Sequence, residues 1–203
     1  MGFLIQRRYG IFLLEYFLMK ARKIFLGIRI PKDVAKRLWT RIEPYASLPL
    51  RMTKEANFHV TLLFIGFRGD EDIALVVRQL ESFCSTVEAF DVTLTDIKLM
   101  PEEGKNARSM LWFVGDEDEN LRMLHNGVRE ALDIAVAEKQ SFRPHITLAR
   151  VRKEKWSELE TQPEVASSWR VSIPVSSIVL FESVFIKGTG LRYETLEEFP
   201  LGE

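Results

Sequence analysis

The sequence carries one short pattern twice, and this repeat limits the choice of fold more than any other feature. The segment "FHVTLLFIGF" contains His59 and "PHITLAR" contains His145, so two of the three histidines share the context His-x-Thr-Leu. Both segments are near-continuous apolar runs with β-branched residues, which is typical of buried strands. Two such strands in distant parts of the chain predict two similar halves, as an internal duplication would produce.

The rest of the chain alternates strand and helix patterns around these two strands. Apolar residues at helical spacing predict a short polar helix near Trp156 and longer helices over residues 31–42, 70–87 and 120–137. Further strand patterns, bounded by turn residues, cover residues 23–30, 90–100, 109–115, 170–175, 176–185 and 192–199. This order predicts an α+β fold with antiparallel or mixed sheets, in preference to a doubly wound parallel sheet.

The composition is that of an ordinary globular protein and excludes several classes of partner. The chain has 28 Lys and Arg against 29 Asp and Glu, for a net charge of −1. No overall positive field therefore favours duplex DNA or an anionic membrane, and any contact with nucleic acid must be local. The single cysteine, Cys84, cannot form an internal disulfide, which fits a reducing compartment and predicts a cytoplasmic location.

Residues 1–18 are interpreted as an N-terminal extension, and residues 19–203 as a single domain. The extension has two arginines before an apolar run, but this run is short, contains Glu15 and lacks a cleavage site. Neither secretion nor a membrane span is therefore expected. Two alternatives stay open for the extension: an amphipathic helix at a membrane interface, or a segment upstream of a natural start at Met19.

The repeated motif brings an imidazole and a hydroxyl together. On a strand, residues i and i+2 share a face, so His59 lies beside Thr61 and His145 lies beside Thr147. If the two strands are neighbours across a pseudo-twofold axis, one site receives two imidazoles and two hydroxyls. Such a pair of imidazoles can move both protons needed to open a cyclic phosphodiester without a metal, one as base and one as acid. The hydroxyls can donate hydrogen bonds to the phosphate oxygens.

Two arginines flank the second motif. Arg143 precedes it and Arg150 follows it, and a guanidinium can bind phosphate through two N–H groups. Strict strand alternation places Arg150 on the face opposite to His145. A contact between Arg150 and phosphate therefore requires a bulge or a strand end between Thr147 and Arg150.

Other residues near the motifs have both a functional and a structural interpretation. Phe58 and Phe142 each come shortly before a motif histidine and are candidates to stack on an RNA base, although core packing is the preferred interpretation. His125 has no matching partner and is interpreted as structural or solvent-facing. A metal site formed by His59 and His145 is disfavoured, because no carboxylate or thiolate stands at ligand spacing. We expect no metal and no cofactor.

The paired motifs resemble those of the two-histidine (2H) phosphoesterase superfamily and, within it, of the RNA 2′,3′-cyclic phosphodiesterases, historically named 2′-5′ RNA ligases. The resemblance covers nearly the whole chain from Met19. The segment "KIFLGIRIPKDVAKRL" is similar to the family's opening strand and helix, and "IVLFESVFIKGTGLRYETLEEFPL" is similar to its closing strands. The resemblance implies a bilobal, pseudo-twofold duplicated fold whose two sheets face a central cleft, with the helices outside.

The resemblance also implies a reaction and a set of roles. The implied reaction is metal-independent hydrolysis of a terminal 2′,3′-cyclic phosphate of RNA to a 2′-phosphomonoester. His59 would give a proton to the leaving 3′ oxygen, and His145 would activate water. Thr61, Thr147 and Arg150 would hold the phosphate. The expected partners are RNA 3′ ends or nucleotides bearing a 2′,3′-cyclic phosphate, and the protein is expected to be a monomer.

The sequence departs from the family pattern at one position and leaves other functions open. Leu63 stands where the family often has a basic or polar residue, so one auxiliary substrate contact is expected to be missing. The alternative functions are 2′-5′ RNA ligation, cleavage of another cyclic or 2′-5′-linked nucleotide, and binding of RNA ends without turnover. A panel of substrates with the regiochemistry of each product separates these functions.

Overall fold

The computed structural model describes residues 21–100, 109–132, 142–161 and 163–202. The interpretation of residues 1–18 lies outside the described residues. The helix predicted over 120–137 ends at Ala131, and residues 133–137 lie outside the described residues. Within the described ranges, no helix combines the length and the apolar character that crossing a membrane requires.

Nine described strands form one sheet, in the order β7-β4-β5-β6-β3-β1-β8-β9, with β2 paired to β6. Every pairing between these strands is antiparallel. The strands are β1 Arg22–Arg29, β2 Leu50–Met52, β3 His59–Arg68, β4 Phe90–Met100, β5 Met110–Val114, β6 His145–Val151, β7 Ala166–Val175, β8 Ser177–Ile186 and β9 Gly190–Pro200.

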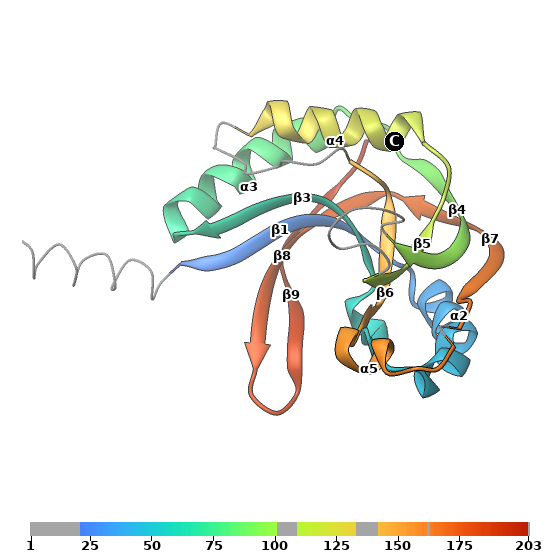
Figure 1. Ribbon diagram of the computed structural model, residues 1–203. Coiled ribbons are helices and arrows are strands. Elements are labelled where there is room, and N and C mark those ends of the chain that lie inside the picture. Colours follow the sequence, from blue (N-terminus) through green and yellow to red (C-terminus); the bar gives the residue numbers. More distant parts are fainter. Residues whose placement is uncertain (1–20, 101–108, 133–141, 162, 203) are drawn as a thin grey trace, which may run out of the picture.

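The sheet consists of two lobes that meet at one pair of residues. Lobe one contains β3, β1, β8 and β9, and lobe two contains β7, β4, β5 and β6. Strands β3 and β6 pair only at Val60↔Ile146, after which β2 takes over as the partner of β6. The structure therefore has one continuous sheet where two were predicted, because this single pair joins the strands of the two lobes. The β8–β9 hairpin projects from the body of lobe one (Figure 1).

The helices cover one side of this sheet. They are α2 Lys32–Ile42, α3 Asp70–Cys84, α4 Glu119–Ala131 and the short α5 Lys153–Ser157. Helices α3 and α4 lie together over lobe one (Figure 1), where α4 contacts β3 and α3 contacts β9. Helix α4 begins where the carboxylate of Asp118 accepts a hydrogen bond from the backbone N–H of Leu121, which is a typical N-terminal cap.

Helix α2 follows a strand of lobe one but packs on lobe two. Its Arg41 donates hydrogen bonds to the Ser167 hydroxyl and the Ser168 carbonyl, both on β7. Conversely, α4 follows β5 of lobe two and packs on lobe one. This exchange of helices makes the two lobes share one apolar core. The described residues of both lobes thus contribute to the same core.

Strand alternation separates a core face from an open face. Leu26 of β1, Val60 of β3 and Ile146 of β6 are buried in the main core beneath the helices. The residues between them point to the other side, which no described helix covers, and we call this side the open face. On it, a separate small cluster of Phe25, Val179 and Phe181 packs against Tyr193.

The predicted elements agree closely with the structure except at short segments. Strand β4 has the predicted bounds, and the predicted hairpin with β5 is confirmed. Strand β2 was not predicted, because three residues are too few to show a period. Two 3₁₀ helices, η1 Glu43–Ser47 and η2 Glu55–Asn57, also went unpredicted for the same reason.

Candidate active site

The two motif histidines start adjacent strands on the same face of the sheet. His59 and His145 are the first residues of β3 and β6, and each precedes a member of the pair Val60↔Ile146. Because that pair points into the core, the residues on either side of it point to the open face. The antiparallel pairing thus brings two imidazoles and the hydroxyls of Thr61 and Thr147 together around one pseudo-twofold point.

A β-bulge follows each motif at the same place. The pairing of β3 with β1 skips Leu62, and the pairing of β6 with β5 skips Leu148. In each strand two consecutive residues are then buried, and the next residue is exposed. The bulge therefore returns Phe64 in β3 and Arg150 in β6 to the open face. A contact between Arg150 and phosphate requires a bulge or a strand end between Thr147 and Arg150, and the structure has this bulge.

Both imidazoles are held in the same way. His59 Nδ1 lies 2.8 Å from the carbonyl oxygen of Asn57, and His145 Nδ1 lies 2.8 Å from that of Arg143. A carbonyl oxygen can only accept, so Nδ1 carries the proton in both rings and Nε2 is the basic nitrogen. In His59 this Nε2 lies 2.9 Å from the Thr61 hydroxyl, which donates to it.

The surroundings of the two rings differ. His59 lies in an aromatic pocket, with its ring centroid 5.0 Å from that of Phe25 and 4.9 Å from that of Tyr193. Gly27 supplies the space for this ring, because a Cβ there would meet the Val60 carbonyl oxygen at 2.8 Å and His59 Cδ2 at 3.4 Å. The His59 pocket is therefore apolar and closely packed.

His145 instead stacks on an indole. The ring centroids of His145 and Trp112 lie 3.7 Å apart, with an angle of 19° between the planes. Trp112 pairs with Thr147 across β5 and β6, as Gly27 pairs with Thr61 across β1 and β3. The pseudo-twofold axis thus relates a tryptophan to a glycine. An imidazolium on the face of an indole gains a cation–π interaction, which the His59 pocket offers less directly.

Burial lowers the pKa of both histidines. For His59, desolvation lowers the pKa from 6.5 to about 4, the hydrogen bond to Asn57 opposes this shift, and the charge of His145 adds to it. For His145, desolvation again lowers the pKa, and the charge of Arg143 contributes in the same direction. The positive charge that His145 can carry lowers the pKa of His59, as expected for two rings on one face of paired strands.

Asn57 ties the His59 loop to the projecting hairpin. Its buried side chain donates to the carbonyl of Leu191 at 2.9 Å and accepts from the backbone N–H of Tyr193 at 3.3 Å. Its own backbone carbonyl holds His59. One residue therefore fixes both the imidazole and the strand that carries Tyr193 against it.

Arg150 and Tyr193 approach one another from the two lobes. Burial raises the pKa of the Tyr193 hydroxyl, and the positive charge of Arg150 opposes that rise. Arg150 itself is exposed on β6, while Tyr193 is half-buried on β9. The two side chains thus belong to strands of different lobes, Arg150 to β6 and Tyr193 to β9.

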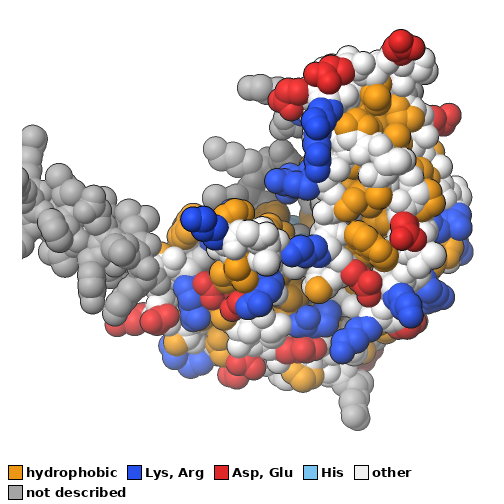
Figure 2. All heavy atoms as spheres, turned by 90° about the horizontal axis from the view of Figure 1, so that it is seen from below, with side chains coloured by type: hydrophobic (Ala, Val, Ile, Leu, Met, Phe, Trp, Pro, Cys, Tyr) orange, Lys and Arg blue, Asp and Glu red, His pale blue; other side chains and the backbone are white. Residues whose placement is uncertain are grey.

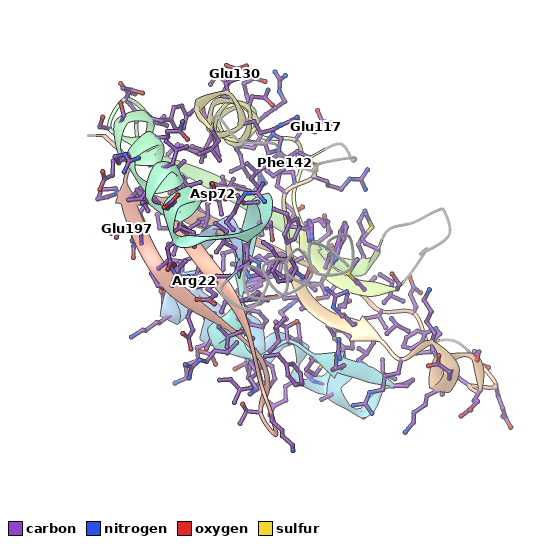
Figure 3. All side chains as sticks on the ribbon, turned by 90° about the vertical axis from the view of Figure 1, so that its left-hand side faces the viewer. Arg22, Asp72, Glu117, Glu130, Phe142 and Glu197 are labelled. Atoms are coloured by element: carbon purple, nitrogen blue, oxygen red, sulfur yellow. The ribbon has the colours of Figure 1, made fainter. Side chains whose placement is uncertain are left out.

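The three candidate RNA contacts have different positions. Arg143 is exposed, and its carbonyl holds His145; among the described residues, no carboxylate forms an ion pair with its side chain. Phe58 is buried in the main core beside Trp39, which leaves no face for a base and supports the core-packing interpretation. Phe142, labelled near α4 in Figure 3, stacks on buried His125 with ring centroids 4.2 Å apart, so one of its faces is already covered.

Four site residues escaped the sequence reasoning. Trp112 and Tyr193 lie at open-face positions of their strands, but a single aromatic residue in a strand gives no signal of its own. Gly27 interrupts an apolar strand, and such a glycine often marks a close approach. Asn57 precedes His59 at the same spacing at which Arg143 precedes His145. Among the described residues, no three histidine, cysteine or acidic side chains gather as metal ligands would.

The sequence matches a known family over most of its length. Residues 30–183 match the family model described as the 2′-5′ RNA ligase superfamily. A relative named RNA 2′,3′-cyclic phosphodiesterase from Aeropyrum pernix is 29% identical over 159 residues, which cover 76% of this chain and 88% of the relative. A protein of the same name from Bacillus subtilis is 24% identical over 183 residues, covering 87% of this chain and 95% of the relative.

Solved structures share the fold. A crystal structure of E. coli LigT complexed with 3′-AMP superposes with a TM-score of 0.72 at 21% identity, covering 90% of this chain and 99% of LigT. TT0787 of Thermus thermophilus gives a TM-score of 0.70 at 24% identity, covering 89% of this chain and 99% of that protein. The predicted bilobal α+β fold is confirmed by these matches.

The low pKa of His59 predicts acid-sensitive stability. The unfolded chain binds a proton on His59 as the pH falls from 6.5 to about 4, whereas the folded protein resists it. The free energy of unfolding is therefore largest, as far as this group is concerned, above pH 6.5 and falls toward pH 4. Urea titrations at pH 7.5 and pH 5 should show a smaller pH difference for His59→Gln than for the unchanged protein. Equal differences in the two proteins would contradict this assignment.

Replacement of Asn57 should loosen the hairpin. Asn57→Ala leaves the carbonyl of Leu191 and the N–H of Tyr193 without their partner, which should lower the free energy of unfolding by about 1–3 kcal/mol. Amide hydrogen exchange at Tyr193 should also become faster. Asn120→Ala, at an exposed position of α4, is the matched control and should change neither quantity. Identical behaviour of the two variants would refute the role of Asn57.

Proposed function

The chain belongs to the 2′-5′ RNA ligase superfamily, and from this premise we propose that it hydrolyses the terminal 2′,3′-cyclic phosphate of RNA to a 2′-phosphomonoester without a metal. The observation that carries the proposal is the placement of His59 and His145 on either side of the pair Val60↔Ile146. The names of the relatives, RNA 2′,3′-cyclic phosphodiesterase, support the same substrate class. The cytoplasmic location and the monomeric state stay predictions.

The reaction needs one proton to be taken from the attacking water and one to be given to the leaving 3′ oxygen. Water attacks phosphorus while Nε2 of His145 accepts a proton from it, and a new P–O bond forms. The bond from phosphorus to the 3′ oxygen breaks, and Nε2–H of His59 gives its proton to that oxygen. After one turnover His145 is protonated and His59 is neutral, and exchange with solvent resets the pair.

The carbonyl partners prepare both rings for these roles. Because Nδ1 donates to a backbone carbonyl in each case, Nε2 is the nitrogen that takes or gives the proton. The carbonyl also favours the protonated ring, which stabilises His145 after it has accepted its proton. The hydroxyl of Thr61 donates to neutral His59 before substrate binds, and it turns to a phosphate oxygen in the complex.

Thr61, Thr147 and Arg150 stabilise the charge that develops on the phosphate. The two hydroxyls flank the pseudo-twofold point and donate to non-bridging oxygens, whose charge rises in the transition state. Arg150 supplies a full positive charge from the position that the β6 bulge creates. Buried Leu63 faces the core and makes no such contact, which agrees with the departure noted from the sequence.

The low pKa of His59 keeps the fraction of protonated His59 smaller in the free protein than in the complex with substrate. At about 4, this pKa leaves His59 mostly neutral at pH 7, whereas the leaving oxygen needs a protonated group. The bound phosphodiester is an anion, and a negative charge next to an imidazole raises its pKa. Substrate binding therefore supplies part of the electrostatic stabilisation that the acid requires.

Removal of either imidazole should abolish turnover. His59→Gln and His145→Gln should each lower kcat by about 10²–10⁴-fold with a nucleoside 2′,3′-cyclic phosphate, because each loses one proton transfer. Assays with excess chelator test the independence from metal, and chromatography identifies the 2′ or 3′ phosphomonoester. Met123→Ala, at an exposed position of α4, is the control. Unchanged turnover in both histidine variants, or binding of RNA ends without any product, would contradict the proposal.

The pH dependence should differ between the free protein and the complex. The quantity kcat/KM reports the free protein, in which the active form has His59 protonated, with a pKa of about 4, and His145 neutral, with a pKa below 6.5. It should therefore peak between about pH 4 and pH 6.5 and fall above that range. The optimum of kcat should lie at higher pH, because bound phosphate raises both values. A kcat optimum below that of kcat/KM would refute this account.

A further inference from the structure

Two arginines lie side by side at the edge of the site. Arg51 of β2 pairs directly with Arg150 of β6 in the antiparallel register. Directly opposed residues of antiparallel strands point to the same face, with their Cβ atoms about 5 Å apart. The two guanidinium groups therefore start from neighbouring positions on one face of the sheet.

That face is the open face. The bulge at Leu148 places Arg150 on the side of Thr147, and its direct partner Arg51 must point the same way. The burial of β2 agrees, because Leu50 is buried in the core while Arg51 is exposed. Arg51 thus belongs to the surface that carries the two histidines, although it comes from the connection between the lobes.

The arrangement of like charges points to an anion. Opposed residues of the same charge destabilise a strand pair, yet neither arginine forms an ion pair with a carboxylate in the described part of the chain. The Arg150 guanidinium contacts only a weak acceptor there, Sδ of Met110 at 3.6 Å. In a chain with a net charge of −1, this is a local concentration of positive charge. Figure 2 shows Lys and Arg side chains along both sides of a hollow in the surface.

Arg51 lies at a distance from the two imidazoles, and therefore also from the phosphate that reacts between them. The Arg51↔Arg150 row lies four residues along β6 from the pair Val60↔Ile146. At about 3.3 Å per residue this is at most roughly 13 Å, and the bulge shortens it. Arg150 lies on the face of Thr147, and its long side chain can reach back along β6 toward the catalytic point. Arg51 lies on β2, which takes the place of β3 beside β6, and is therefore placed for a second phosphate.

We propose that Arg51 binds the internal phosphodiester on the 5′ side of the terminal nucleoside, beside Arg150. The inference rests on the proposed function and narrows its substrate class to oligonucleotides, with free cyclic mononucleotides as poorer substrates. A planar guanidinium suits this task, because it binds two phosphate oxygens with parallel N–H groups. The neighbouring positive charges are then neutralised by the two successive phosphates of one RNA strand.

The experiment compares two substrates in the full-length protein. Hydrolysis of a trinucleotide with a 2′,3′-cyclic phosphate end and of the matching nucleoside 2′,3′-cyclic phosphate is measured for Arg51→Gln. The kcat/KM of the trinucleotide should fall about tenfold or more, while that of the mononucleotide stays within about twofold. Arg51→Lys keeps the charge but loses the planar guanidinium. Its kcat/KM with the trinucleotide should lie between the values of the unchanged protein and of Arg51→Gln. Arg78→Gln, at an exposed position of α3 on the helix side, is the matched control.

Each outcome either supports or overturns the proposed role of Arg51. An equal loss on both substrates would place Arg51 at the reacting phosphate or in the fold, and no loss on either would remove it from the site. Both results overturn the inference. A fluorescence titration with a trinucleotide ending in a 2′-phosphate gives an independent readout, and Arg51→Gln should lower the salt slope of log K by about 0.7. If the unchanged protein hydrolyses neither substrate, the proposed function fails, and this titration still tests Arg51.

Discussion

The pairing of Val60 with Ile146 is the constraint on which the candidate site depends. It is the single direct register contact between β3 and β6, and it joins two lobes whose helices are exchanged. Since both side chains of this pair enter the shared core, the histidines that precede them must turn to the open face. A change that slips this register by one residue would turn one imidazole into the core and leave the other on the open face. The geometry of the site is therefore fixed by apolar packing on the opposite side of the sheet.

The duplicated halves supply equivalent chemistry in unequal surroundings. Each half gives a histidine held through Nδ1, a threonine two residues later, and a bulge that exposes the next side chain. The difference lies in the neighbours: Gly27 and an aromatic pocket surround one ring, and the indole of Trp112 supports the other. Two groups that must carry different protonation states during a reaction benefit from such an asymmetry. In the proposed reaction, the bound phosphate would raise the pKa of both rings, because it lies beside each of them.

The sequence predicted the elements whose pattern is local and repeated. The two His-x-Thr strands were clear because apolar runs and matching motifs reinforce one another, and the α+β class followed from the order of elements. The sequence could not predict the single pair between β3 and β6 or the exchange of α2 and α4, because both arise from packing between distant segments. The bulge at Leu148 was identified only as a requirement for Arg150. Trp112, Asn57 and Tyr193 were missed, since their roles depend on contacts across strands rather than on neighbours in the chain.

The convergence of the two imidazoles is tested most directly by NMR titration of the ring nitrogens. If the two rings share one site, both histidines should carry the proton on Nδ1 at neutral pH, and His145→Gln should raise the pKa of His59 by removing a nearby positive charge. A nucleoside 2′-phosphate should raise both pKa values together. Independent titration of the two rings, with only one of them responding to the nucleotide, would contradict a shared site.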